Sequence, residues 1–166
     1  WAVDARASLL LVQAYAEHAA GRYEAEPDGG SDESGGGSEG AGSSGSAVLP
    51  GSVVLMTSGQ GLGPMPEEIA YCTAKAALAG ITPSLAAGLA ERGIRLNTVN
   101  PGPVDTGYMD YPGCEDDGLR DAVAGMFPRG RIAQPDDPAR LICWLLTDDA
   151  SWVTGQVISA EGGFRR

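Results

Sequence analysis

The stretch Ile94-Arg95-Leu96-Asn97-Thr98-Val99-Asn100-Pro101-Gly102-Pro103 decides the fold of this 166-residue chain. Its first seven residues predict a β-strand, and the proline and glycine residues that follow stop that strand with a fixed turn. Before it, a helix is expected from about Glu67 to Glu91, ended by Arg92-Gly93. Earlier still, Ser52–Thr57 predicts a buried strand, because it is a short apolar run bounded by glycines. Strands that alternate with helices favour a parallel sheet.

The alternation continues on both sides of this unit. Apolar residues at helical spacing predict a helix from Trp1 to about Ala20. The region Asp105–Pro128 is expected to be loop and short helix. Asp137-Pro138 is expected to open a helix that ends near Leu146, with the aspartate as its cap, and Gly155–Ala160 predicts a third strand. The expected fold is therefore α/β, with helices on both faces of the sheet.

One segment has the composition of a linker. From Gly29 to Ser46, 14 of 18 residues are glycine or serine, within a Gly/Ser-rich acidic insert at 27–47. Such a segment buries too little apolar surface to offset its ordering entropy, so we expect a mobile loop. We interpret it as a solvated linker, and an acidic partner-binding loop is the alternative.

Charge and cysteine content restrict the class of partner. The net charge of −11 argues against nucleic acid and against anionic membranes, because both need basic patches. No apolar run approaches the roughly 18 residues of a membrane span. The cysteines Cys72, Cys114 and Cys143 are widely spaced, which suits reduced thiols in a cytoplasmic protein. With His18 as the only histidine and no paired cysteines, no metal site is expected.

Lys75 is the only lysine of the chain, and it stands four residues after a tyrosine in Tyr71-Cys72-Thr73-Ala74-Lys75. Positions i and i+4 share one face of a helix, so the expected helix brings the phenol and the ammonium group together. A cation beside a phenol favours the phenolate, which lets a tyrosine act as a general acid or base. A solvated pair on a helix face is the alternative when these two residues are taken alone.

Ser58 directly follows the first strand, at the end where ligands gather in open parallel sheets. A loop can return its hydroxyl to Tyr71, where it can donate to a carbonyl oxygen while the phenol transfers a proton. A turn serine at a strand end is the alternative. The glycines of Gly59-Gln60-Gly61-Leu62-Gly63 are not a dinucleotide fingerprint, because Pro64 and Pro66 separate them from the helix.

Five segments in their order and spacing are specific to one family. They are Trp1–Leu11, Val53–Ser58, Tyr71–Lys75, Asn97–Thr106 and Gly130–Gly163. Through them the chain resembles the carboxyl-terminal two-thirds of a classical short-chain dehydrogenase/reductase, and especially members that are similar to 3-oxoacyl-carrier-protein reductase. The resemblance implies the carboxyl-terminal part of a Rossmann-like, doubly wound parallel sheet, with residues 1–166 as one partial domain.

The resemblance also implies an activity and a YxxxK active site. The activity is hydride transfer between NAD or NADP and a small carbonyl or alcohol substrate. Tyr71 would be the proton donor or acceptor, Lys75 would favour its phenolate and bind the nicotinamide ribose, and Ser58 would orient the substrate carbonyl. The nicotinamide end of the cofactor would be lined by Pro101, Gly102, Val104 and Thr106, in addition to Tyr71 and Lys75. Thr106 as a helix cap is the alternative for that residue.

Two departures from the family pattern matter. Asp4 stands where the family usually has an asparagine that holds a water in the proton relay, so we expect reduced or pH-shifted activity. The family's first half, with its phosphate-binding loop and its NAD/NADP-selecting residue, has no counterpart here. We therefore expect Val53–Thr57 to have an unpaired edge and the chain to be a fragment that binds the cofactor poorly. A truncated, non-catalytic remnant that acts as an interaction or structural subunit is the alternative function.

The resemblance finally implies a homotetramer or a homodimer, formed through the long helices and the last strand. The apolar positions Leu78, Ile81 and Leu85 fit such an interface, although core packing explains them as well. The lobe Gly107–Pro128 is expected to form an apolar lid over the substrate.

Overall fold

The computed structural model describes residues 2–23, 51–107 and 117–165. Within these ranges the elements follow one another as α1 (Ala2–Tyr23), β1 (Gly51–Met56), η1 (Gly59–Gly61), α2 (Ile69–Ala90), β2 (Ile94–Asn100), α3 (Asp117–Gly125), α4 (Asp136–Leu145), η3 (Asp148–Ala150) and β3 (Val157–Ser159). The insert predicted at 27–47 and part of the lobe, residues 108–116, lie outside the described residues.

The three described strands form one parallel sheet in the order β1-β2-β3. The register pairs Gly51 with Ile94 through Met56 with Val99, and Thr98–Asn100 pair with Val157–Ser159. The strands predicted around Ser52–Thr57 and at Ile94–Asn100 are therefore confirmed, as is their parallel arrangement. The fold is α/β and Rossmann-like.

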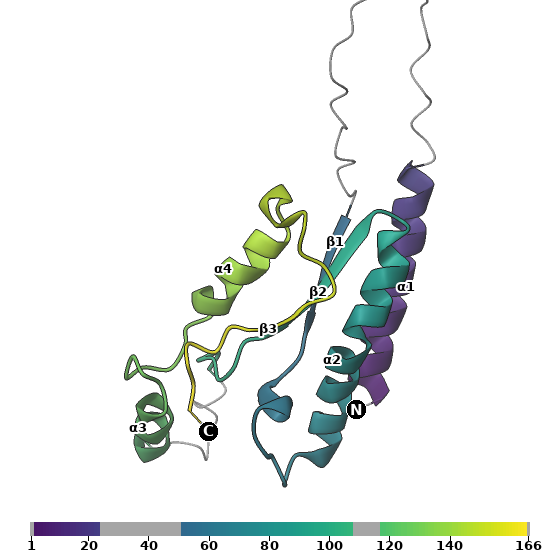
Figure 1. The fold of residues 1–166 in the computed structure, drawn as a ribbon. Coiled ribbons are helices and arrows are strands. Elements are labelled where there is room, and N and C mark those ends of the chain that lie inside the picture. The colour runs from purple at the N-terminus through teal and green to yellow at the C-terminus, as the bar shows by residue number, and fades with distance from the viewer. Residues whose placement is uncertain (1, 24–50, 108–116, 166) are drawn as a thin grey trace, which may run out of the picture.

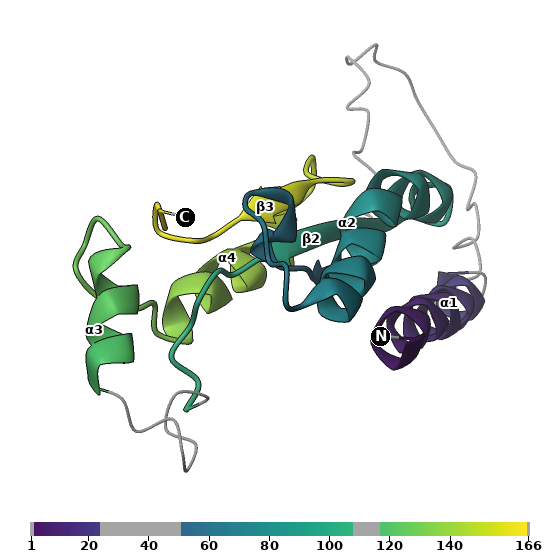
Figure 2. The same ribbon diagram turned by 90° about the horizontal axis from the view of Figure 1, so that it is seen from below.

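Helices cover both faces of this sheet, as expected. Figure 1 shows α1 and α2 side by side on one side of the strands and α4 on the other, and the view in Figure 2 agrees. The predicted helices at 1–20 and 67–91 are confirmed with small shifts of their ends. Gly93, at φ 70°, follows α2 in the left-handed conformation that glycine favours.

Side chains alternate between the two faces along the strands, as the pleat requires. On the face toward α1 and α2, Ile94 and Leu96 are fully buried and pack with Leu55 of β1. On the other face, Val99 packs with Leu145 of α4. Every residue of β2 is buried, so this strand is the centre of the core.

The apolar positions that fitted an oligomer interface belong largely to this core. Leu78 is 1% exposed, and Leu85 packs against the cluster around Leu96. Core packing therefore explains these two residues. The tetramer or dimer stays a prediction.

A buried arginine joins β2 to the end of α4. Arg95 is 4% exposed, and its guanidinium donates to the carbonyl oxygens of Leu145 (2.8 Å), Thr147 (3.0 Å) and Val153 (3.4 Å). The carbonyl groups at a helix carboxyl end carry partial negative charge, so they compensate the buried cation. Ser52 of β1 donates to the same Leu145 oxygen (3.0 Å), which fixes α4 across both strands.

Two details at the carboxyl-terminal end differ from the prediction. The helix α4 begins at Asp136, so Asp137 is inside it and is not its cap, although Pro138 does lie in the first turn. The third strand is only three residues long. Before it, the Gly155 N–H donates to the Leu96 carbonyl oxygen and the Thr98 N–H to the Gln156 carbonyl oxygen. Side chains add to this pairing, because the Thr154 hydroxyl accepts from the Leu96 N–H and the Asn97 side chain accepts from the Gln156 N–H.

The outer edge of β1 pairs with no other strand among the described residues, as expected. A groove of ≈ 610 Å³ follows this edge. It is lined by Ser8, Leu11, Val12 and Tyr15 of α1, by Ser52, Val53, Val54, Leu55 and Met56 of β1, and by Lys75 of α2.

Candidate active site

The predicted site residues that the structure describes come from two neighbouring strand ends and one helix start. Ser58 follows β1, and Pro101 follows β2, at the same edge of the sheet, because Met56 pairs with Val99 in parallel register. Tyr71 and Lys75 lie in the first two turns of α2. This edge, at the carboxyl ends of parallel strands, is where ligands bind in open α/β sheets.

Tyr71 and Lys75 lie together, as their spacing predicted. The Lys75 ammonium nitrogen is 5.9 Å from the centroid of the Tyr71 ring. The same nitrogen donates to the Met56 carbonyl oxygen (3.2 Å), which holds the ammonium at the end of β1, two residues before Ser58. The Tyr71 side chain is 42% exposed, and its hydroxyl makes no hydrogen bond within the described chain. Its phenol is therefore accessible to a ligand.

Thr57 is the residue that fixes Ser58 relative to α2. Its N–H donates to the Val99 carbonyl oxygen (2.9 Å), and its hydroxyl donates to the Lys75 carbonyl oxygen (2.8 Å). This one buried residue, directly after β1, is thus bonded to β2 through its main chain and to the helix turn that carries the lysine through its side chain. The sequence analysis missed Thr57, because a strand pattern does not show where a terminal hydroxyl donates.

Ser58 is partly buried and extended, with φ −141° and ψ 173°. It precedes the short helix η1, but its hydroxyl makes no capping hydrogen bond to it. Among the described residues this hydroxyl has no other partner. The role of Ser58 in orienting a substrate stays a prediction, with a turn serine as its alternative.

The turn after β2 is held in one conformation. The Asn100 side chain accepts from the Gly102 N–H (3.1 Å) and donates to the Ser159 hydroxyl (3.3 Å). Gly102 has φ +66°, and a Cβ there would lie 3.0 Å from Glu161 Cβ. A residue other than glycine would be strained at this position.

The second half of this turn presents main-chain groups. Val104 forms an isolated parallel bridge with Ala133, and the Asp105 N–H donates to the Ala133 carbonyl oxygen (2.8 Å). The N–H and C=O of Val104 itself make no hydrogen bond to any described residue. Thr106 is exposed beside them. The turn thus offers a donor and an acceptor to a ligand.

An ion pair ties this turn to α3. Arg120 donates to both carboxylate oxygens of Asp105, at 3.0 and 3.3 Å. The hydrogen bond from Arg120 is the main reason why the pKa of Asp105 lies below its usual value. Neither residue was singled out in the sequence analysis, because they are 15 residues apart and no local pattern joins them.

The position of Asp4 is described only through its backbone in α1. It lies one helical turn before Ser8, which lines the groove beside β1 together with Lys75. Its proposed part in a proton relay stays a prediction.

The described residues hold no group of three or more His, Cys, Asp or Glu side chains placed to bind a metal ion. None of the described helices is long and apolar enough to span a membrane.

Comparison with known proteins gives the family. The model of a family described as enoyl-(acyl carrier protein) reductase matches residues 43–165, which is most of the chain. The chain therefore belongs to the short-chain dehydrogenase/reductase family, and it corresponds to the carboxyl-terminal portion of that family's fold.

Three similar proteins place it more closely. The uncharacterized oxidoreductase YjdA of Bacillus subtilis is 48% identical over 114 residues, which are 69% of this chain and 43% of the relative. The 3-oxoacyl-[acyl-carrier-protein] reductase FabG of Rickettsia conorii is 35% identical over 111 residues, 67% of this chain and 45% of the relative. The crystal structure of the angucycline C-6 ketoreductase LanV with bound NADP aligns at a TM-score of 0.60 and 28% identity, covering 68% of this chain and 42% of that one. The matched region spans less than half the length of these relatives.

Proposed function

We propose that the protein is, or is part of, an NAD- or NADP-dependent oxidoreductase that interconverts a small carbonyl compound and its alcohol. The observation that carries this proposal is the Tyr71–Lys75 pair, with the ammonium held on the Met56 carbonyl oxygen beside Ser58. Family membership supports it, because named relatives are dehydrogenases and reductases. Residues 1–166 would form one partial domain, with the insert at 27–47 and the lobe at 107–128 as appendages.

The chemistry follows from the charges at the site. As the carbonyl is reduced, negative charge develops on its oxygen, and Tyr71 is placed to give that oxygen its proton. The Lys75 ammonium stabilises the negative charge that remains on the phenol oxygen. The unpartnered Ser58 hydroxyl can donate to the same substrate oxygen and fix its position. In alcohol oxidation the proton moves in the opposite direction.

The residues present fit the nicotinamide end of the cofactor. Val104 offers a main-chain donor and acceptor side by side, which is the complement of a carboxamide. Lys75 adds a cation on the helix that faces the same edge of the sheet, where a ribose hydroxyl could accept from it. The nicotinamide cofactor supplies the hydride when bound, whereas the protein supplies placement.

The test is Tyr71→Phe in the full-length protein, assayed for NADH and NADPH oxidation with a panel of small ketones and aldehydes. Loss of the proton donor should lower kcat by about a hundredfold or more. Thermal stabilisation by NADP should persist, because the ring and Lys75 remain. Tyr23→Phe, which changes the last residue of α1 outside the predicted site and lobe, is the control. Equal activity in Tyr71→Phe and the native protein would contradict the assignment.

Cofactor binding distinguishes the two proposed functions, an active oxidoreductase and a non-catalytic remnant. A cofactor site stabilises the folded state by mass action, so NADH or NADPH should raise the Tm of a competent enzyme. If neither cofactor shifts the Tm and no carbonyl compound is reduced, the protein is a non-catalytic interaction or structural subunit.

A further inference from the structure

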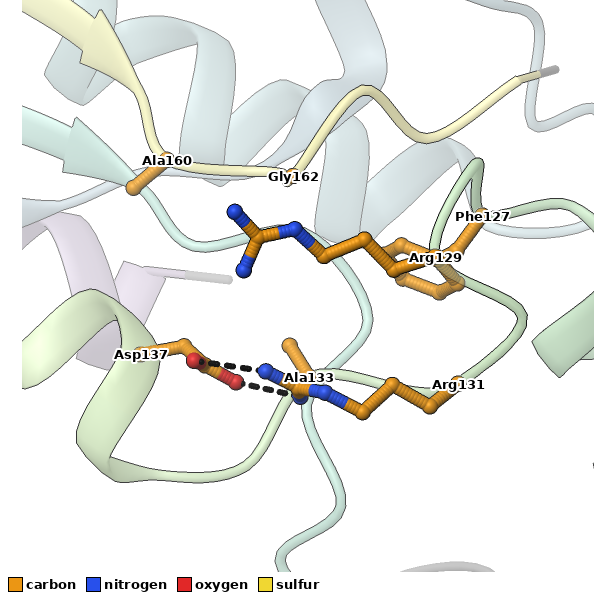
Figure 3. A pocket seen from close by; sticks show the side chains of 7 residues that line it. All are labelled: Phe127, Arg129, Arg131, Ala133, Asp137, Ala160 and Gly162. Atoms are coloured by element: carbon orange, nitrogen blue, oxygen red, sulfur yellow. Dashed lines mark hydrogen bonds and ion pairs between the residues drawn. The ribbon is translucent and has the colours of Figure 1, made fainter.

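A second cavity adjoins the turn after β2, because its lining residue Ala133 forms a bridge with Val104. It has a volume of ≈ 360 Å³ and contains none of Ser58, Tyr71 and Lys75. Figure 3 shows its lining, which comprises Phe127, Arg129, Arg131, Ala133, Asp137, Ala160 and Gly162. These residues come from the segment between α3 and α4, from the first turn of α4 and from the segment after β3.

One wall of the cavity is electrically neutral. Arg131 donates to both carboxylate oxygens of Asp137, at 2.7 and 3.0 Å, and the Gln134 N–H donates to one of them (2.7 Å). These bonds hold the pKa of Asp137 well below its usual value. Arg131 therefore balances the charge of this carboxylate.

The opposite wall carries a cation with no carboxylate of its own. Figure 3 shows the Arg129 guanidinium extending into the cavity on the side of Ala160 and Gly162, apart from the Arg131–Asp137 pair. Within the described part of the chain, Arg129 makes no hydrogen bond or ion pair. In a chain of net charge −11, this cavity therefore has a local surplus of one positive charge.

The rest of the lining is apolar and well anchored. The Phe127 side chain is 5% exposed, and its ring lies 4.9 Å from that of Phe164. The Arg165 N–H donates to the Met126 carbonyl oxygen (2.9 Å), which fixes the segment after β3 against the segment after α3. These contacts hold the lining in place, so binding needs little reorganisation.

We propose that this cavity binds a small organic carboxylate, with Arg129 as the residue that holds its charged end. A guanidinium presents two parallel N–H groups that match a carboxylate. One surplus positive charge matches a monoanion, whereas a dianionic phosphate would need a second free cation. The apolar body of the ligand would contact Phe127, Ala133 and Ala160. The proposal does not rest on the proposed function, since the two sites share no residue, but they are neighbours through the Val104–Ala133 bridge.

Benzoate is a suitable probe, and benzyl alcohol is its neutral counterpart. Binding to the full chain is measured from NMR shifts of the Gly162 and Ala160 amides at constant ionic strength. Benzoate should bind about fivefold more tightly than benzyl alcohol, since Arg129 is exposed and an exposed ion pair contributes up to about 1 kcal/mol. Arg129→Gln should lower the affinity for benzoate by a similar factor and leave the affinity for benzyl alcohol unchanged. Arg92→Gln, which removes an exposed arginine outside the cavity, should leave both unchanged.

Three results would overturn the proposal. The first is the absence of benzoate shifts in the native chain at about 50 mM. The second is equal binding of benzoate to Arg129→Gln and to the native chain. The third is an equal loss in Arg92→Gln, which would show a general effect of net charge. Far-UV circular dichroism of both variants excludes loss of fold as the cause.

Discussion

At the scale of single residues, two glycines with different backbone angles show how conformation and contacts decide a substitution. Gly102 has φ +66° in the turn of the proposed active site, and an added Cβ would meet Glu161 at 3.0 Å. Gly80 lies inside α2, and an added Cβ there would meet nothing within 4 Å. The same chemical change should therefore have opposite effects at the two positions.

We expect Gly102→Ala to destabilise the protein by about 1–2 kcal/mol, since an L-residue is strained in the left-handed region. Gly80→Ala should stabilise it by up to about 1 kcal/mol, because alanine loses less backbone entropy in a helix. Urea unfolding of both variants and the native chain is the measurement. Two changes of the same sign would show that the turn after β2 relaxes easily.

The sequence predicted the contact between Tyr71 and Lys75, because both lie on one helix and the spacing is local. It did not predict the hydrogen bond from Thr57 to the Lys75 carbonyl oxygen, because that bond depends on how β1 docks against α2. The same limit applies to Arg95: a strand pattern contains no sign that its guanidinium reaches the end of α4.

At the scale of elements, α4 is held at each end by an arginine from elsewhere in the chain. Arg131 binds Asp137 in the first turn, and Arg95 binds the carbonyl groups at the last turn. Sequence analysis placed this helix nearly correctly but assigned Asp137 as its cap. The carboxylate does accept a main-chain N–H, that of Gln134, but from a position inside the helix. A prediction from residue type alone cannot distinguish these two positions.

The ion pair at the start of α4 should make stability depend on pH in acid. The pKa of Asp137 is lower in the folded than in the unfolded chain, mainly through the hydrogen bond from Arg131. Its contribution is therefore fully present above the unfolded pKa of about 4 and is lost as the pH falls through the folded value. Asp137→Asn should lower the free energy of unfolding at pH 7, and the difference from the native chain should shrink below pH 4.

Asp121→Asn is the control, because this carboxyl on α3 is exposed and forms no ion pair among the described residues. The difference in the free energy of unfolding between Asp121→Asn and the native chain should change far less between pH 7 and pH 3. If the free energy of unfolding of Asp137→Asn differed from that of the native chain by a constant amount across that interval, the ion pair would not be the source of the pH dependence.

At the scale of the whole molecule, the outer edge of β1 is unpaired among residues 2–23, 51–107 and 117–165. The family resemblance predicted this edge. Nothing in the sequence predicted the arginine cavity, since Arg129 and Gly162 are more than 30 residues apart. Their segments are joined by the packing of Phe127 on Phe164 and by the Arg165–Met126 hydrogen bond. Local patterns thus gave the sheet and its helices, whereas long-range packing decided the second cavity.

An edge of this kind should make the 166-residue chain self-associate. The strand β1 presents unpaired main-chain groups, and the groove beside it is lined by apolar side chains that include Leu11, 70% exposed on α1. Leu11→Lys places a charge in that groove without disturbing the core, so the oligomeric fraction in sedimentation velocity should fall several-fold. Leu119→Lys changes an exposed leucine on α3, outside the groove, and should have no effect. An equal fall in both variants would mean that association depends on net charge, and a monomeric native chain would mean that the open edge attracts no second copy.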